Sequence, residues 1–177
     1  MRFFQTTKYQ GLSSIYFNAI IEQIIMTGDL HNKNYILDYG CGEKKIQKKL
    51  NKKIYNYDIN PLYNEIEIDN LKNLKLETVI LSHVLMYMTL KEIKELFNQF
   101  YLLNNNMNFV VALGRQNILS KILKYLTFNK NAHRGTLTSY KKQKLYIYNE
   151  FNINRVKKNI FFMTDVINFS FKSKNAN

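Results

Sequence analysis

The sequence predicts a single-domain α/β protein with a mostly parallel, seven-stranded sheet, helices on both faces of that sheet and a C-terminal antiparallel hairpin. Two observations predict this fold class. Short β-prone apolar runs alternate with longer segments of helical period, as expected of parallel strands joined by crossover helices. The 177 residues, 46% of them apolar, are enough to bury one sizeable core, and they contain no internal repeat or linker.

Five apolar runs are expected to form the parallel strands, and the third of them is weakly defined. They are residues 35–39, 54–58, 66–68, 79–82 and 109–113. Two further β-prone stretches, residues 153–162 and 166–171, predict the closing hairpin, with residues 163–165 between them. Together these runs give the seven expected strands.

Segments of helical period lie before, between and after the strands. They are residues 12–26, ending near Gly28; the stripe Ile46, Leu50 and Ile54; and residues 90–101, 116–127 and 138 to about 150. Thr89 and Glu92 form a capping box that begins the helix at residue 90. A loop at residues 129–136 precedes the last helix.

Cysteine content and hydropathy bound the compartment. The lone Cys41 excludes an internal disulfide and a multi-thiolate zinc site, which favours a reducing compartment, and no metal site is expected. Neither a signal peptide nor a run of about 18 uncharged apolar residues, the length a membrane-spanning helix needs, is present. We therefore expect a cytoplasmic protein without a membrane span.

The chain is strongly basic. It carries 26 Lys and Arg against 13 Asp and Glu, a net charge of +13 that favours RNA, phosphates or a membrane surface. Only four of these cations are arginine, whose planar fork matches phosphate, so the charge alone argues weakly for nucleic acid. Six lysines lie on one face of a predicted helix. This face is either a solvated surface or a contact for RNA or anionic lipid. The six are Lys44, Lys45, Lys48, Lys49, Lys52 and Lys53.

The most informative segment reads ILDYGCGEKK at residues 36–45, where a buried strand turns into a helix. Gly40 and Gly42 lack a Cβ and so let backbone amides approach a ligand, and the amides of the following helix favour a carboxylate or phosphate. A dinucleotide fingerprint would need a third glycine where Lys45 stands, and a P-loop would need Gly-Lys-Ser/Thr. NAD and ATP are therefore disfavoured.

Acidic residues follow the neighbouring strands. Asp58 lies eighteen residues after Gly40, close to the spacing at which a carboxylate meets a ribose diol, and Asp69 follows the weak third strand. Ser82 and His83 follow the fourth strand. This order resembles the class I S-adenosylmethionine-dependent methyltransferases, which have a Rossmann-like fold, and in particular their small-molecule "type 11" branch. The resemblance covers about residues 35–113.

The resemblance implies S-adenosyl-L-methionine as cofactor and a set of cofactor-binding residues. These are Asp38, Gly40, Cys41, Gly42, Asp58, Asp69, Asn70, Ser82 and His83. Two departures stand out: GCGEKK replaces the usual GCGxG, which lets Lys44 face the cofactor carboxylate, and Met86 with Tyr87 replaces an acid and a histidine common in the family. Cys41 is expected to contribute only its backbone.

The acceptor side is expected after the fifth strand, because ligands of open parallel sheets bind at the carboxyl ends of the strands. Arg115 leaves such an end, and the segment AHRGTLTSY at residues 132–140 is the other dense polar patch. The candidate substrate-binding residues are Arg115, His133, Arg134 and Tyr140, and the candidate catalytic bases are His133 and His83. Thr138 and Ser139 can instead simply cap a helix. Tyr9 and Tyr16 are candidates for a flap over the cofactor.

The chain is thus expected to form one methyltransferase-like domain. It comprises a helical cap at residues 1–30, a cofactor-binding core at 35–113 and an acceptor side at 114–177. The expected activity is methyl transfer to a small molecule or a glycan- or lipid-linked precursor, because the core leaves few residues for a larger acceptor site. The alternatives are an RNA methyltransferase and a non-catalytic binding module with a decayed pocket.

Overall fold

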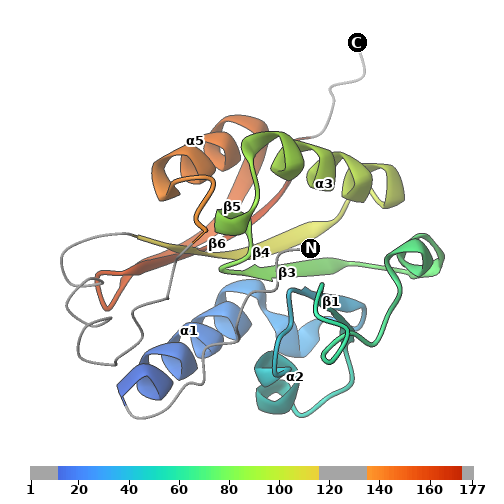
Figure 1. Cartoon of the computed structure of the whole chain (residues 1–177), viewed down its shortest axis with the longest axis horizontal. Coiled ribbons are helices and arrows are strands. Elements are labelled where there is room, and N and C mark those ends of the chain that lie inside the picture. Colours follow the sequence, from blue (N-terminus) through green and yellow to red (C-terminus); the bar gives the residue numbers. More distant parts are fainter. Residues whose placement is uncertain (1–11, 116–134, 173–177) are drawn as a thin grey trace.

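The structure is a computed structural model, and it describes residues 12–115 and 135–172. A mixed sheet lies between two helical layers, with α1 and α2 on one face and α3 and α5 on the other (Figure 1). The helices are α1 (Leu12–Gly28), α2 (Lys45–Leu50), α3 (Leu90–Leu103) and α5 (Tyr140–Glu150). The strands are β1 (Ile36–Tyr39), β2 (Tyr55–Tyr57), β3 (Thr78–Ser82), β4 (Asn108–Gly114), β5 (Phe151–Ile160) and β6 (Thr164–Phe171).

In the described part of the chain, the sheet has six strands in the order β2-β1-β3-β4-β6-β5. The first four are parallel to one another, β6 runs antiparallel to β4, and β5 runs antiparallel to β6. The carboxyl ends of β1, β3 and β4 therefore meet the start of β6 at one edge, which we call the carboxyl edge. In the register, Gly114 pairs with Thr164 and Leu113 with Asp165.

The expectation of seven strands is wrong, because residues 66–68 do not form the third one. Glu65 donates its backbone N–H to the carbonyl of Asn56 at 3.1 Å, which is the one backbone hydrogen bond that the segment makes to β2 in the described residues. The chain then enters a 3-10 helix, Ile68–Asn73, before a ladder can form. The α/β class, the parallel strands on either side and the closing hairpin are confirmed.

The structure shortens one expected helix and confirms the start of another. α2 ends at Leu50 because Asn51 adopts a left-handed conformation, φ 50°, so Ile54 is buried ahead of β2 and is not the next turn of the helix. The capping box that begins α3 is confirmed: Thr89 Oγ1 accepts from Glu92 N, and the Glu92 side chain accepts from Thr89 N. The helix expected at residues 116–127 lies outside the described residues.

Two cores of different character fill the space beside the sheet. The core under α1 is aliphatic and includes Ile24 and Val110, whereas the core under α3 and α5 is built around aromatic rings. These rings are Phe97, Phe100, Phe109, Phe151 and Phe169. Because neighbouring residues of a strand face opposite layers, Thr164 points toward the α1 side with Val166, and Asp165 toward the α5 side with Ile167.

Candidate functional site

The turn from β1 into α2 lies at the carboxyl edge and depends on two glycines. Gly40 and Gly42 both have positive φ, 83° and 48°. The amides of Gly40 and Cys41 donate to the carbonyl of Tyr57 at 2.7 and 3.1 Å, which fixes the turn against the end of β2. A Cβ on Gly40 would lie 2.4 Å from Val84 Cγ2, whereas a Cβ on Gly42 would meet nothing within 4 Å. The turn is thus packed at Gly40 and open at Gly42.

This difference predicts unequal effects of two matched substitutions. Gly40→Ala is expected to lower the free energy of unfolding by about 2 to 4 kcal/mol, because a left-handed non-glycine residue and an overpacked contact both cost energy. Gly42→Ala adds the same methyl group into open space and should cost only about 1 to 2 kcal/mol, the left-handed penalty alone. Urea denaturation of the two variants measures the difference, and equal losses would contradict this account of the turn.

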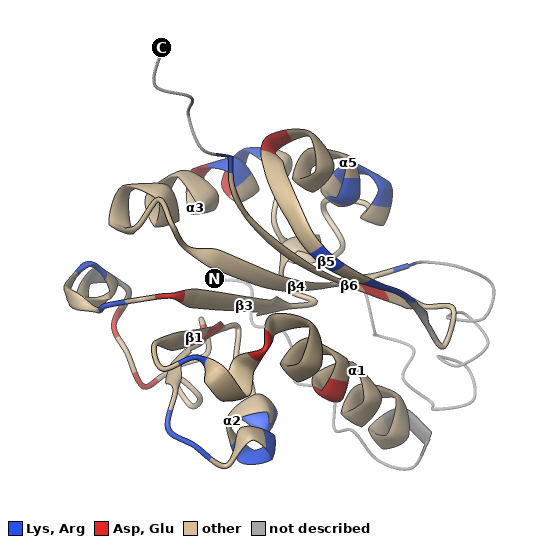
Figure 2. Cartoon of the chain, turned by 180° about the vertical axis from the view of Figure 1, so that it is seen from behind, with Lys and Arg blue, Asp and Glu red and all other residues tan. Residues whose placement is uncertain are grey.

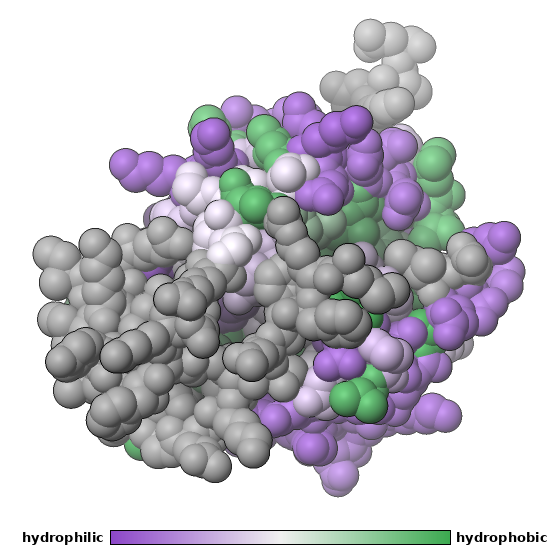
Figure 3. Space-filling model, viewed as in Figure 1, coloured by the Kyte–Doolittle hydropathy of each residue, from purple (hydrophilic) through white to green (hydrophobic). Residues whose placement is uncertain are grey.

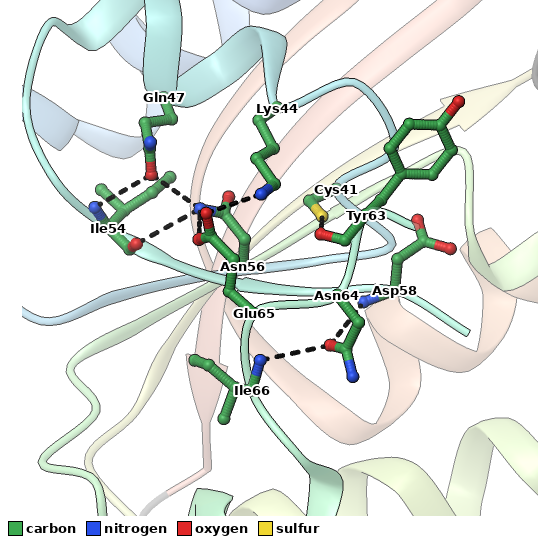
Figure 4. Close-up of polar contacts among 10 residues, drawn as sticks. All are labelled: Cys41, Lys44, Gln47, Ile54, Asn56, Asp58, Tyr63, Asn64, Glu65 and Ile66. Carbon is green, nitrogen blue, oxygen red and sulfur yellow. Dashed lines mark hydrogen bonds and ion pairs between the residues drawn. The ribbon is translucent and has the colours of Figure 1, made fainter. Parts of the chain in front are cut away.

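Asp58 follows β2 and reaches across to this turn. Its Oδ2 accepts a hydrogen bond from Gly42 N at 2.8 Å, and its Oδ1 accepts one from Asn60 N at 2.8 Å. Asn64 steadies the segment by accepting from the amides of Asp58 and Ile66 through Oδ1 (Figure 4). The half-buried carboxylate is therefore held at the open side of the glycine turn.

Asp38, in β1, places a second carboxyl group at the same edge. It is only 2% exposed, and the described part of the chain gives its carboxyl group no hydrogen-bond partner. Burial, together with the nearby charge of Asp58, raises the pKa of Asp38 to about 7. The group is thus poised to ionise near neutral pH, and a cation or hydrogen-bond donor beside it would favour the charged form.

The pKa of Asp38 predicts how stability depends on pH. The folded protein keeps this proton up to about pH 7, whereas the unfolded chain releases it near pH 3.8, so stability is lost as pH rises between these values. Asp38→Asn removes this loss, and its advantage over the parent should grow by at most about 1.4 kcal/mol per pH unit in that window. Urea denaturation across the window tests it; curves that stay parallel would contradict the assignment.

A network of polar side chains joins the start of α2 to β2 and to the connection that follows β2. Asn56, fully buried in β2, donates through Nδ2 to Gln47 Oε1 and to Glu65 Oε2, both at 2.6 Å (Figure 4). Lys44 pairs with Glu65 at 2.6 Å, and the Lys44 and Asn56 hydrogen bonds lower the pKa of Glu65. Lys44, which the sequence allows to face the cofactor carboxylate, pairs with Glu65 in this structure. Sequence patterns gave no signal for Gln47, Asn56 or Glu65.

Cys41 lies within the turn with its side chain buried. Its thiol contacts the carbonyl oxygen of Tyr63 at 3.5 Å. Burial, with the negative charges of Asp38 and Asp58, raises the pKa of the thiol to about 12, so it stays protonated and unreactive at neutral pH. Cys41 thus offers the site a backbone amide and not a nucleophile.

His83 follows β3 at the same edge in a left-handed conformation, φ 58°. Its Nε2 lies 3.3 Å from Thr164 Oγ1, and Thr164 Oγ1 lies 2.5 Å from the hydroxyl of Tyr16 on α1. Ser82 Oγ lies 3.4 Å from the other ring nitrogen, Nδ1. Because Thr164 has one hydroxyl proton, it can donate to only one of these two neighbours, and the tautomer of His83 sets the direction of the hydrogen bond between them. The sequence did not single out Thr164.

The side chains of Arg115 and Tyr140, expected to bind substrate, converge on a carboxylate that the sequence left unmarked. Asp165 is fully buried and accepts from Arg115 at 2.8 and 3.1 Å, from the Tyr140 hydroxyl at 2.5 Å and from Lys144 at 3.0 Å. The Arg115 guanidinium also lies over the Tyr140 ring at 5.1 Å. We call these four residues the Asp165 cluster; it ties the end of β4 to α5.

The remaining expected residues divide into three groups. His133, Arg134 and Tyr9 lie outside the described residues, as does the side chain of Asp69. Asn70 is an exposed residue of the 3-10 helix after residue 67. Ser139 caps α5 by accepting from Lys142 N, as the structural alternative above predicts. The buried Thr138 does not cap the helix; its hydroxyl donates to the carbonyl of Met88.

Two apolar side chains beside Asp58 were not predicted from the sequence. Ile59 and Leu62 are 67% and 83% exposed on the connection that follows β2. Large apolar side chains exposed next to an oriented carboxylate and an open glycine turn provide a surface for a flat, partly apolar ligand group. The signal available was their position directly after the acid at the end of the second strand.

Comparison with known proteins gives a fold but no sequence relative. No family model and no curated protein sequence matches the chain. Among solved structures, magnesium protoporphyrin IX methyltransferase from Synechocystis PCC 6803, with bound SAH, matches with a TM-score of 0.59 and 14% identity over 95% of this chain and 90% of that one. The chain has the fold of the class I S-adenosylmethionine-dependent methyltransferases. A Pyrococcus horikoshii OT3 protein matches with a TM-score of 0.65 and 12% identity, over 94% and 95% of the two chains.

Another solved structure with the methyltransferase fold is the small RNA methyltransferase HEN1. It matches with a TM-score of 0.62 and 11% identity, over 97% of this chain but only 27% of that longer one. Within the described residues, no helix is both long and apolar enough to cross a membrane, and no group of three His, Cys, Asp or Glu side chains could hold a metal ion.

Proposed function

We propose that this protein binds S-adenosylmethionine at the Gly40 to Gly42 turn and transfers its methyl group to an acceptor. One observation carries the proposal: the open space at Gly42 adjoins the oriented carboxylate of Asp58, at the carboxyl edge of a sheet with the methyltransferase fold. The bound SAH of the Synechocystis methyltransferase supports the choice of cofactor.

The residues at the edge fit the chemical parts of this cofactor. Asp58 would accept hydrogen bonds from the ribose hydroxyls, and the exposed Ile59 and Leu62 would pack against the adenine. Asp38, a carboxyl group buried without a hydrogen-bond partner among the described residues, would pair with the methionine ammonium group. Asp69, Asn70 and Ser82 remain proposed contacts.

Methyl transfer asks little acid–base chemistry of the protein. When bound, S-adenosylmethionine supplies a methyl group already activated by its sulfonium charge. The residues at the edge therefore have to align the acceptor and exclude water. Where the acceptor must lose a proton, His83 is the imidazole at this edge, held by Thr164, that would take it. His133 stays a proposed second base.

The two described side chains that were expected to bind the acceptor are held within the protein. A small molecule or a glycan- or lipid-linked precursor was expected to use Arg115 and Tyr140, but both side chains are engaged by Asp165. These two side chains therefore do not support that acceptor class. A cytoplasmic location fits the free, buried thiol of Cys41.

Ligand-dependent stability separates the proposal from a non-catalytic binding module. Thermal denaturation with S-adenosylhomocysteine at one hundred times its dissociation constant should show about 2.7 kcal/mol of stabilisation. Calorimetry with S-adenosylmethionine then gives the affinity, and transfer of a labelled methyl group into candidate acceptors tests the activity. A flat thermal response would instead favour a fold that has lost its cofactor site.

A further inference from the structure

The positive charge of the chain is concentrated in its C-terminal part. Residues 12–115 hold 12 Lys and Arg against 11 Asp and Glu, which nearly cancel. Residues 135–172 hold seven against two, and one of those two acids is the buried Asp165. A codon bias toward lysine would raise the charge of both parts, so it does not explain the difference between them.

The fold brings this charge to the edge that carries the candidate site. β5 runs parallel to β4, so its last residues lie at the carboxyl edge, and α5 begins at the same edge because Leu137 N donates to the carbonyl of Met86 at 2.8 Å. Lys141 and Lys142 in the first turn of α5, and Lys157 and Lys158 near the end of β5, are all exposed. We call these four the edge lysines. Figure 2 shows blue Lys and Arg segments on both α5 and β5.

The edge lysines differ from the lysine face on α2 in what surrounds them. On α2, Lys44, Lys45 and Lys49 each pair with a glutamate, and Lys52 donates to backbone carbonyls. No acidic side chain pairs with any edge lysine within the described ranges. Three of the six α2 lysines are thus paired with a carboxylate, whereas none of the four edge lysines is paired with one in the described residues.

Two exposed aromatic side chains follow Lys157 and Lys158 in the chain. Phe161 and Phe162, in the turn after the last residue of β5, are 50% and 69% exposed. Phe161 also stacks edge-on against Tyr16, with ring centroids 6.0 Å apart, and Tyr16 contacts the Thr164 hydroxyl that His83 shares. The aromatic turn is therefore continuous with the candidate site. Cations beside exposed aromatic rings suit a single-stranded nucleic acid, whose bases stack while its phosphates pair.

We propose that the edge lysines, with Phe161 and Phe162, bind a single-stranded segment of RNA and bring one of its nucleotides to the methyl-transfer site. RNA is favoured because unpaired bases able to stack are presented chiefly by its loops, bulges and ends. An anionic membrane would call for a continuous apolar face, whereas apolar side chains are scattered among hydrophilic ones over α5 and α3 (Figure 3). As an assignment of the acceptor, this inference rests on the proposed function.

Two variants of equal charge test the proposal. K141Q/K142Q/K157Q/K158Q removes the edge lysines, and K45Q/K48Q/K49Q/K53Q removes four lysines from the α2 region. Binding of a fluorescently labelled single-stranded RNA 12-mer is followed by anisotropy over a range of salt concentrations. The first variant should bind at least about tenfold more weakly, and its salt dependence should fall by about 0.7 log units for each phosphate that is no longer neutralised. The α2 variant should keep the parent affinity within about twofold.

A third variant isolates the stacking. F161A/F162A should weaken binding of the same RNA by about tenfold. The salt dependence of binding should not change, because the rings carry no charge. If the two lysine variants lose equal RNA affinity, net charge alone explains the binding, and the proposal is overturned. Binding to phosphatidylserine vesicles but not to RNA, or tighter binding to a DNA 12-mer of the same sequence, would also overturn it.

S-adenosylhomocysteine binding keeps the two proposals apart. The lysine and phenylalanine variants should bind S-adenosylhomocysteine as the parent does, since none of the substituted residues belongs to the glycine turn. Normal cofactor binding without site-dependent RNA binding would overturn the RNA proposal alone. RNA binding that depends on the edge lysines, in a protein that does not bind the cofactor, would uphold the surface and overturn the assignment of its RNA as a methyl acceptor.

Discussion

Replacing Asp58 by alanine is expected to weaken S-adenosylmethionine binding by at least about a hundredfold, because two hydrogen bonds to a charged acceptor are each worth about 1.5 to 3 kcal/mol. The carboxylate is already oriented in the free protein by Gly42 N and Asn60 N, each 2.8 Å away, so little is lost in ordering it on binding. Calorimetry measures the affinity, and thermal denaturation without ligand shows how much of the change comes from loosening the turn.

Two controls narrow the interpretation. Asp58→Asn keeps one acceptor oxygen and the shape of the side chain, so its loss should fall between those of the parent and the alanine variant. Glu67→Ala removes an exposed carboxylate from the same connection and should leave affinity within about twofold. Parent-like binding by Asp58→Ala would reject the ribose assignment, and with it the main support for this cofactor site.

The glycine turn and Asp58 could be predicted from sequence because their signals are local. A buried strand that ends in glycines and enters a helix has few possible conformations. Gly40 has a positive φ in this turn, which a glycine adopts without steric cost because it has no Cβ. Asp58 stands at the end of the next strand, and parallel neighbours bring their ends together. Sequence alone thus located the one edge where the carboxylates of Asp38 and Asp58 gather.

The missing third strand shows where local signals fail. Residues 66–68 are β-prone, but a strand also needs a partner along its length, and only Glu65 bonds to β2. The turn formed by Asn60 and Asn64 uses side-chain acceptors for backbone amides, which replace the ladder with local bonds. The β-propensity of a residue reflects how well its side chain fits a pleated, half-buried sheet. Residues 66–68 have no partner strand along their length, so their propensity does not produce a strand.

The direction of the Arg115 side chain could not be predicted from the sequence, because it depends on a distant residue. The position of Arg115 after the fifth strand was predicted, but the direction of its side chain depends on Asp165, fifty residues later, which the sequence placed between two strands as a connecting residue. The pairing of β4 with β6 brings Asp165 opposite Leu113 and so beside Arg115. No local pattern encodes that register, so an arginine at a strand end could not be told apart from one held by an internal ion pair.

The Asp165 cluster leads to the second large effect expected, on stability. Asp165→Ala should lower the free energy of unfolding by about 3 to 5 kcal/mol, because it leaves Arg115, Lys144 and the Tyr140 hydroxyl around a buried cavity without their shared acceptor. For a domain of this size each kcal/mol shifts the melting temperature by about 2 to 4 °C, so a decrease of about 10 °C is expected. Thermal denaturation at neutral pH measures it.

Arg115→Ala is the informative companion, because the two interpretations of Arg115 predict different results. If Arg115 chiefly anchors β4 to α5, the variant should melt several degrees lower and keep its kcat and KM for methyl transfer, since Lys144 and Tyr140 still satisfy Asp165. If it binds the acceptor, KM or kcat should change by at least about tenfold while the melting temperature stays near that of the parent. The 2.8 Å contact of Arg115 with a fully buried carboxylate favours the first outcome, because moving the guanidinium to a substrate would strand the Asp165 charge with fewer partners.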